Sequence, residues 1–121
     1  MQRSKLIVAL LLSVSSAAAY AGGSTWSGAN VTNITSYPTG GPAGKGYVVV
    51  TFSSNGAGTP SCASGYPRNV AIDISTPGGA FAAAASQTAM LTGMVVTVIG
   101  TGTCSVVPTA ETLASIQTTG H

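Results

Sequence analysis

The segment from Arg68 to Cys104 constrains the fold of this 121-residue chain more than any other stretch. It begins with RNVAIDIS, in which apolar and polar residues alternate with the two-residue period of a strand that has one buried face. Its middle part, TPGGAFAAAASQTAMLTG, is rich in alanine and predicts a helix. Its last part, MVVTVIGTGTC, has the near-continuous apolar character of a strand buried on both faces. The segment therefore predicts a strand, a helix and a second strand, in that order.

The ends of this helix follow from its flanking residues. Thr76 is a suitable N-cap, and Pro77 suits the first helical position because the N–H that proline lacks has no partner there. Gly93 is placed to end the helix in the left-handed conformation. Gly78 and Gly79 weaken the opening turn, so a start one or two residues later is the alternative.

No residue between Ala80 and Thr92 is charged, which is unusual for a helix with one face in solvent. An apolar stripe at helical spacing predicts the face that packs on the core: Phe81, Ala84, Ala85, Thr88 and Leu91. Two interpretations of the other face stay open. Either its small residues simply tolerate water, or it packs on a second copy of the protein. The interface would then contain Ala82, Ala83, Ser86, Gln87 and Met90.

Residues 1–21 have the three-part pattern of a secretory signal peptide. Arg3 and Lys5 precede the apolar run Leu6–Val14, and a segment of small residues ends at Ala21. Cleavage is expected after Ala21, which leaves residues 22–121 as a single domain. The apolar run is shorter than the roughly 20 residues that span a bilayer. A membrane anchor that is retained rather than cleaved is the alternative interpretation. We therefore expect a secreted protein, periplasmic or extracellular, without membrane insertion.

Removal of this leader changes the charge of the chain. The formal net charge is +2, and the surplus comes from the leader. The two remaining cations, Lys45 and Arg68, balance the two carboxylates that follow the leader. A neutral chain has no electrostatic footprint for phosphate backbones, so we expect no nucleic-acid partner.

Cys62 and Cys104 are the only cysteines. An exported chain meets oxidising conditions, in which a disulfide between them would persist. A small domain gains little stability from burial alone, and closing this loop would contribute about 4 kcal/mol in the chain-entropy model. Two free thiols are one alternative. A metal site is another, although its histidine and carboxylate partners are scarce, and we expect no metal and no cofactor.

Three further strands are expected. Ala29–Ser36 alternates imperfectly and is compatible with a bulge, Tyr47–Phe52 is the most β-branched run, and Glu111–Thr118 is a strand or a short helix. The resulting order places one helix between strands three and four. This is the order of the OB-fold, a five-stranded barrel that binds oligosaccharides or oligonucleotides. A β-sandwich with an accessory helix is the alternative.

The chain resembles small exported bacterial proteins related to the B subunit of subtilase cytotoxin in three segments: PSCASGYPRNVAIDI, AFAAAASQTAMLTG and MVVTVIGTGTC. The resemblance covers roughly Gly46–Thr118. It implies an OB-fold barrel in which a disulfide joins Cys62, before strand three, to Cys104, at the end of strand four. It also implies ring-shaped pentamers that bind cell-surface glycans and have no catalysis of their own.

Reactive side chains are too few to favour an enzyme. The only histidine is His121, at the chain end, and Asp73 and Glu111 are the only carboxylates after the leader. A glycosidase needs two carboxylates a few ångströms apart, and a serine hydrolase needs an internal base. No G-x-S-x-G or S-x-x-K motif follows the leader.

We therefore expect a secreted, non-catalytic binding module that is homo-oligomeric and binds glycans. Its candidate ligand-binding residues combine aromatic rings with one guanidinium group: Trp26, Tyr37, Tyr66 and Arg68. The alternative is a structural, self-assembling extracellular protein without a small ligand. Such a protein would assemble through the helix or through open strand edges.

Overall fold

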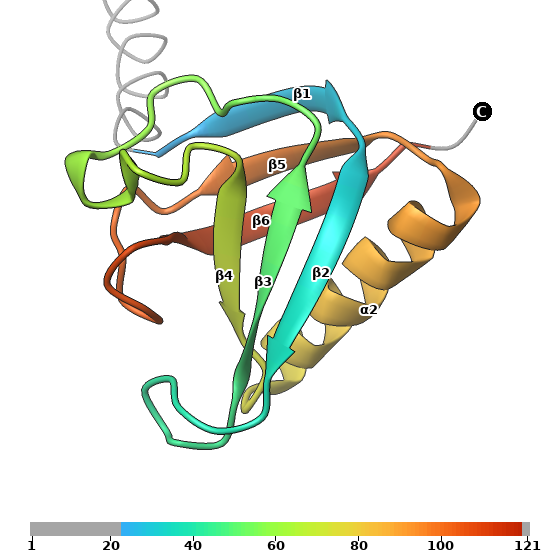
Figure 1. Ribbon diagram of the computed structural model, residues 1–121. Coiled ribbons are helices and arrows are strands. Elements are labelled where there is room, and N and C mark those ends of the chain that lie inside the picture. Colours follow the sequence, from blue (N-terminus) through green and yellow to red (C-terminus); the bar gives the residue numbers. More distant parts are fainter. Residues whose placement is uncertain (1–22, 120–121) are drawn as a thin grey trace, which may run out of the picture.

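The computed structural model describes residues 23–119, which form a curled six-stranded sheet with one helix packed against it (Figure 1). The strands are β1 (Thr25–Ala29), β2 (Val31–Tyr37), β3 (Tyr47–Phe52), β4 (Asn69–Asp73), β5 (Val96–Gly100) and β6 (Glu111–Thr118). The helix α2 (Pro77–Thr92) connects β4 to β5, and a short 3-10 helix, Ser61–Ala63, lies between β3 and β4. The expected leader, residues 1–21, and His121 lie outside the described residues.

The order of the strands forces the sheet to curl. Across the sheet the order is β1-β5-β6-β4-β3-β2, so β1 and β2 lie at opposite edges. Only Asn30 separates these two strands in the sequence. The edges of a flat six-stranded sheet would lie about 24 Å apart, which is much farther than one residue can span. The sheet therefore closes on itself as a half-barrel around the core.

The expected count of five strands is wrong, and the helix follows the fourth strand rather than the third. The strand expected at Ala29–Ser36 starts earlier and is divided into β1 and β2. Gly28 adopts a left-handed φ of 73°, and the register of β1 against β5 shifts beside it. The Asn30 N–H then donates to Ser53 Oγ at 3.0 Å, outside the β1–β5 ladder. A bulge and a corner therefore interrupt what the sequence presents as one run.

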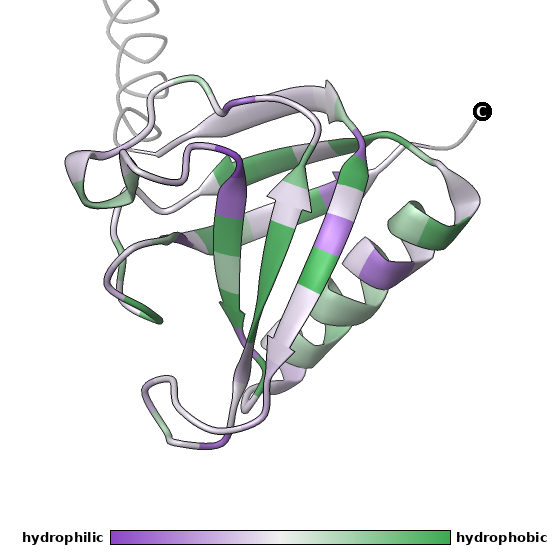
Figure 2. Ribbon diagram, in the orientation of Figure 1, coloured by the Kyte–Doolittle hydropathy of each residue, from purple (hydrophilic) through white to green (hydrophobic). Residues whose placement is uncertain are grey.

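The remaining expected strands are confirmed. Tyr47–Phe52 and Glu111–Thr118 form β3 and β6, and the short helix considered for the latter is not formed. In β3, Val48, Val50 and Phe52 point into the core while the residues between them are half-buried. Figure 2 shows hydrophobic residues along β3, β4 and β5, the strands that enclose the core.

An aromatic pair lies at the centre of the core. Trp26 and Phe52 are 2% and 1% exposed, and their ring centroids are 4.9 Å apart. The indole Nε1 donates to the Ser54 carbonyl at 2.9 Å, which satisfies its only polar group. Gly56 must lack a side chain, since a Cβ there would lie 2.7 Å from the indole ring. The remaining core residues include Val31, Val48, Val50, Val70, Ile72, Ala89, Val96 and Val98.

The two halves of the sheet meet at a short parallel pair. Strands β4 and β6 pair at two register positions, Val70 with Glu111 and Ala71 with Thr112, whereas the other strand pairs in residues 23–119 are antiparallel. The disulfide between Cys62 and Cys104 joins the segments that precede these two strands. The expected disulfide is therefore confirmed, and it fastens the starts of β4 and β6.

The expected helix ends are confirmed. The Gly79 N–H donates to Thr76 Oγ1 at 3.0 Å, and Pro77 occupies the first helical position. A Cβ at Gly79 would lie 1.8 Å from the Asp73 carbonyl oxygen, so glycine permits the tight approach of the helix start to β4. Gly93 ends the helix with a left-handed φ of 73°. The alternative start, beyond both glycines, is not adopted.

The face of α2 that packs on the sheet is not the expected one. The helix packs against β2, β4 and β6. Ser86 and Ala89 on this inward face are buried, and the side chains around them pack against the core: Ala82, Ala83 and Met90. Small side chains allow a close approach of the helix to the sheet, which explains why this face of α2 packs inward. The expected contact with a second copy is therefore corrected for four residues of the expected interface: Ala82, Ala83, Ser86 and Met90.

The outward face of α2 contains the large apolar residues that were expected in the core. Phe81 is 79% exposed and Leu91 is 75% exposed. Gln87, the remaining residue of the expected interface, is also exposed. The outward face therefore combines two large apolar side chains with no charge.

The same substitution on each face of α2 tests this orientation. We expect Ala89→Leu to lower the free energy of unfolding by about 1–3 kcal/mol, because the larger side chain overpacks the core. Ala84→Leu, on the exposed face, should change it by less than about 0.5 kcal/mol. Urea denaturation of both variants measures the difference, and equal destabilisation would contradict the orientation.

Candidate functional site

Three tyrosines share a hollow on the outer surface of the sheet. Its volume is about 170 Å³, and its lining comes from β2, β3, β4 and two loops: Tyr37, Tyr47, Val49, Tyr66, Asn69, Val107, Thr109 and Ala110. We call this the tyrosine hollow. The sequence has four tyrosines, and the one outside this group is Tyr20 in the expected leader. All tyrosines that follow the leader therefore lie at one place.

The hairpin formed by β2 and β3 positions two of the rings. Tyr37 and Tyr47 are register partners at the end of this hairpin, and their rings are stacked with centroids 4.8 Å apart and planes 16° apart. The loop between them is closed by a hydrogen bond from the Gly46 N–H to the Gly40 carbonyl at 3.0 Å. Gly46 has a φ of 106°, and a Cβ there would lie 2.9 Å from the Pro38 carbonyl oxygen. Glycine at this position therefore allows the tight return that aligns the rings.

The third ring comes from the segment that carries Cys62. The Tyr66 N–H donates to the Ala63 carbonyl at 2.9 Å, and the Tyr66 carbonyl accepts from the Asn69 N–H at 3.1 Å. These bonds fix the backbone on both sides of the ring, while the side chain is 54% exposed. Tyr66 is therefore held at the margin of the hollow with its ring open to solvent.

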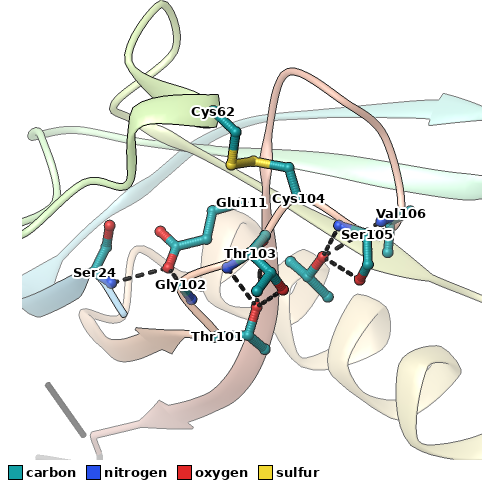
Figure 3. The surroundings of a disulfide bond; sticks show 10 residues. Ser24, Cys62, Thr101, Gly102, Thr103, Cys104, Ser105, Val106 and Glu111 are labelled. Carbon is teal, nitrogen blue, oxygen red and sulfur yellow. Dashed lines mark hydrogen bonds between the residues drawn. A yellow bond between two sulfur atoms is a disulfide. The ribbon is translucent and has the colours of Figure 1, made fainter. Parts of the chain in front are cut away.

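The loop between β5 and β6 forms the opposite wall. Ser105 and Val106 donate their N–H groups to Thr112 Oγ1 at 2.9 and 3.4 Å, which draws the loop towards β6. Cys104 anchors the start of this loop through its disulfide to Cys62 (Figure 3). The disulfide therefore links the two segments that supply Tyr66 and the opposite wall of the hollow.

The lining of the hollow is amphipathic and contains no charged side chain. Aromatic faces and valine side chains provide apolar contact, and three phenol groups, one amide and one hydroxyl provide hydrogen bonds. The volume is below the roughly 300–1,000 Å³ of a site for a drug-sized ligand. The hollow therefore suits one small neutral group with both an apolar face and polar edges.

Only part of the expected ligand set lies at this site. Tyr37 and Tyr66 are brought together, although 29 positions separate them in the sequence. Tyr47 was missed, and its position across a glycine-rich loop from Tyr37 was the available signal. Trp26 is buried in the core, so its assignment as a ligand platform is wrong. Arg68 is exposed, does not line the hollow, and donates from Nε to Asn55 Oδ1 at 3.1 Å.

The two carboxylates are held by separate sets of donors. Asp73 accepts from the Ser75 hydroxyl and N–H, and these two hydrogen bonds lower the pKa of its exposed carboxyl group. Glu111 is buried and accepts from the Ser24 and Gly102 N–H groups. Residues 23–119 contain no group of three or more histidine, cysteine or acidic side chains arranged to hold a metal ion.

Loss of the disulfide should destabilise the protein strongly. The bond closes a loop with a sequence separation of 42, so the chain-entropy model predicts a loss of about 4 kcal/mol in the free energy of unfolding. We expect this loss in urea denaturation when the native protein is reduced. The Cys62→Ser, Cys104→Ser double variant is the control and should not respond to reductant. Equal midpoints for the oxidised protein and the double variant would contradict the prediction.

Comparison with protein-family models, curated proteins and solved structures finds no match for this chain. Within residues 23–119, no helix combines the length and the apolar character that crossing a membrane requires.

Proposed function

We propose that this protein is a secreted, non-catalytic module that binds neutral carbohydrate through the tyrosine hollow. The observation that carries this proposal is the gathering of three tyrosines at one uncharged hollow. A sugar ring has an apolar face of C–H groups and a rim of hydroxyls, which matches aromatic faces bordered by an amide, a hydroxyl and phenol groups. The small volume fits a single ring or the end of a glycan chain.

The topology supports an OB-like barrel as the scaffold. If β1 and β2 are counted as two halves of one bent strand, the chain has five strands, with α2 between the third and the fourth. OB-folds bind their ligands on the face of the second and third strands, between the loop after strand one and the loop after strand four. In this count the tyrosine hollow lies at the corresponding place, on the outer face of β3 and β4 and between the same two loops.

Export is supported by the leader pattern and by the disulfide. The three-part pattern of residues 1–21 predicts secretion, and the disulfide requires an oxidising compartment to persist. The balanced charges after the leader do not favour nucleic acid as a partner. The resemblance to the B subunits of subtilase cytotoxin agrees with glycan binding without catalysis.

Removal of one ring from the hollow tests the proposal. A glycan array would first identify a neutral saccharide, and titration calorimetry with its free monovalent form would then measure affinity. We expect Tyr37→Ala and Tyr66→Ala each to weaken binding about twofold to tenfold, as expected for the loss of one aromatic contact. Phe81→Ala removes an exposed ring on α2 and should leave the affinity unchanged. The absence of any ligand on the array, or equal binding by all variants, would overturn the proposal.

We also propose that the outward face of α2 assembles copies of the chain. Phe81 and Leu91 expose large apolar side chains on a helix without charged residues. Exposed apolar surfaces of this kind are usually covered by a partner. A second copy is the partner implied by the resemblance to ring-forming toxin subunits. The same face favours the alternative function, a self-assembling structural protein, if assembly continues beyond a closed ring.

Charge on this face should abolish assembly. We expect the native protein to form a discrete oligomer and the Phe81→Glu, Leu91→Glu double variant to be monomeric, because assembly would bury the new carboxylates. Ser64→Glu, on an exposed loop, is the control and should keep the native mass. Size-exclusion chromatography with light scattering measures the mass. A monomeric native protein would refute the assembly, and filaments would favour the structural alternative.

A further inference from the structure

A row of three polar side chains crosses the outer face of β2, β3 and β4. Thr51 in β3 is the register partner of both Asn33 in β2 and Asn69 in β4. Directly paired side chains of neighbouring strands lie on one face of the sheet, with Cβ atoms about 4.5–5.5 Å apart. This is the outer face, because Val50 and Phe52, on either side of Thr51, are buried in the core. We call Asn33, Thr51 and Asn69 the polar row.

The polar row adjoins the tyrosine hollow. Asn69 belongs to both, since it also lines the hollow. At its other end the hollow is lined by Tyr37 and Tyr47, and Val49 lies between the two ends on β3. Tyr47 and Thr51 are four positions apart on one strand, which corresponds to about 13 Å along β3. The hollow and the polar row therefore form one continuous track along this face.

The track is open to solvent beyond the hollow. Figure 1 turns the outer face of β2 and β3 towards the viewer, and no segment of residues 23–119 crosses in front of these two strands. Asn33 is exposed and Thr51 is half-buried. The described part of the chain therefore leaves space on the polar row for a group that extends from the hollow.

The polar row presents uncharged hydrogen-bonding groups. Two carboxamides and one hydroxyl can both donate to and accept from the hydroxyls of a sugar. The Asn33 Nδ2 donates to Thr35 Oγ1 at 3.0 Å, which holds this amide in place with only one of its two N–H groups. A held amide loses little side-chain freedom when a ligand binds.

The charged side chains near this face lie outside the polar row. Arg68 donates from Nε to Asn55 Oδ1, and Asp73 accepts from the Ser75 hydroxyl and N–H. Lys45 lies in the loop between β2 and β3. The polar row therefore matches neutral hydroxyl groups better than it matches an anion.

We propose that the tyrosine hollow and the polar row form one extended site for a neutral oligosaccharide. The terminal sugar occupies the hollow, and the next sugar lies on the polar row. Asn33 and Thr51 hydrogen-bond to hydroxyls of the second sugar, and Asn69 is shared between the two sugars. This inference rests on the carbohydrate binding proposed for the hollow. It narrows the ligand class to chains of at least two neutral sugars.

Glycosides of two lengths test the extended site. The probes are the methyl glycosides of the terminal one and two sugars of the best neutral glycan on the array. We expect calorimetry to show that the two-sugar form binds at least about fivefold more tightly, because it gains several hydrogen bonds. Asn33→Ala and Thr51→Val should each weaken its binding about twofold to tenfold and leave the affinity for the one-sugar form unchanged.

Ser36→Ala is the matched control. Ser36 is also in β2, but it lines the groove that faces α2 rather than the outer face. This variant should bind both glycosides as the native protein does.

Equal affinities for the two glycosides, or native two-sugar affinity in both variants of the polar row, would overturn the extended site. The hollow would still stand if Tyr37→Ala weakened binding of the one-sugar form, so the two failures are distinguishable. NMR of the native protein provides a second measurement if the variants do not fold. The two-sugar form should shift the backbone amide signals of Asn33 and Thr51, whereas the one-sugar form should not. Unchanged signals with both glycosides would contradict the proposal.

Discussion

The connection through Asn30 is the constraint on which the rest of the structure depends. It joins the two edge strands of the sheet, so the sheet must close and the residues of its concave face must form a single core. The same residue also fastens the helix, because Asn30 Nδ2 donates to the Gly93 carbonyl at 3.3 Å. The corner of the first strand and the end of α2 are thus tied together. This link places the helix beside β2 and leaves the outer surface of β3 and β4 free for the tyrosine hollow.

Most elements could be predicted because local signals determine them. Thr76, Pro77 and Gly93 determine the ends of α2, and alternation identifies β3. The division of the first strand could not be predicted, since it depends on a left-handed residue at Gly28 and on closure of the whole sheet. Which face of α2 packs on the sheet could not be predicted from the sequence either. This helix is apolar nearly all round, so the steric fit of small residues such as Ala89, rather than periodicity, determines its orientation.

The candidate site could be predicted only in part for a similar reason. Tyr37 and Tyr66 were identified as single aromatic residues, but their meeting depends on a hairpin, a disulfide and a loop far along the chain. Tyr47 was within reach of prediction, because two tyrosines flanking a glycine-rich loop pair when a hairpin forms. Trp26 was misassigned because the largest side chain of a small domain also fills its core best.

The position of the disulfide determines how the protein responds to a protease. The stretch between Cys62 and Cys104 contains β4, α2 and β5, which is a large part of the domain. Cleavage of the backbone anywhere within this stretch leaves two fragments that remain covalently attached. The fragments stay at the high mutual concentration of a tethered pair, so the cut molecule can reclose its core. A protein bridged in this way tolerates an internal nick that would separate the pieces of an unbridged chain.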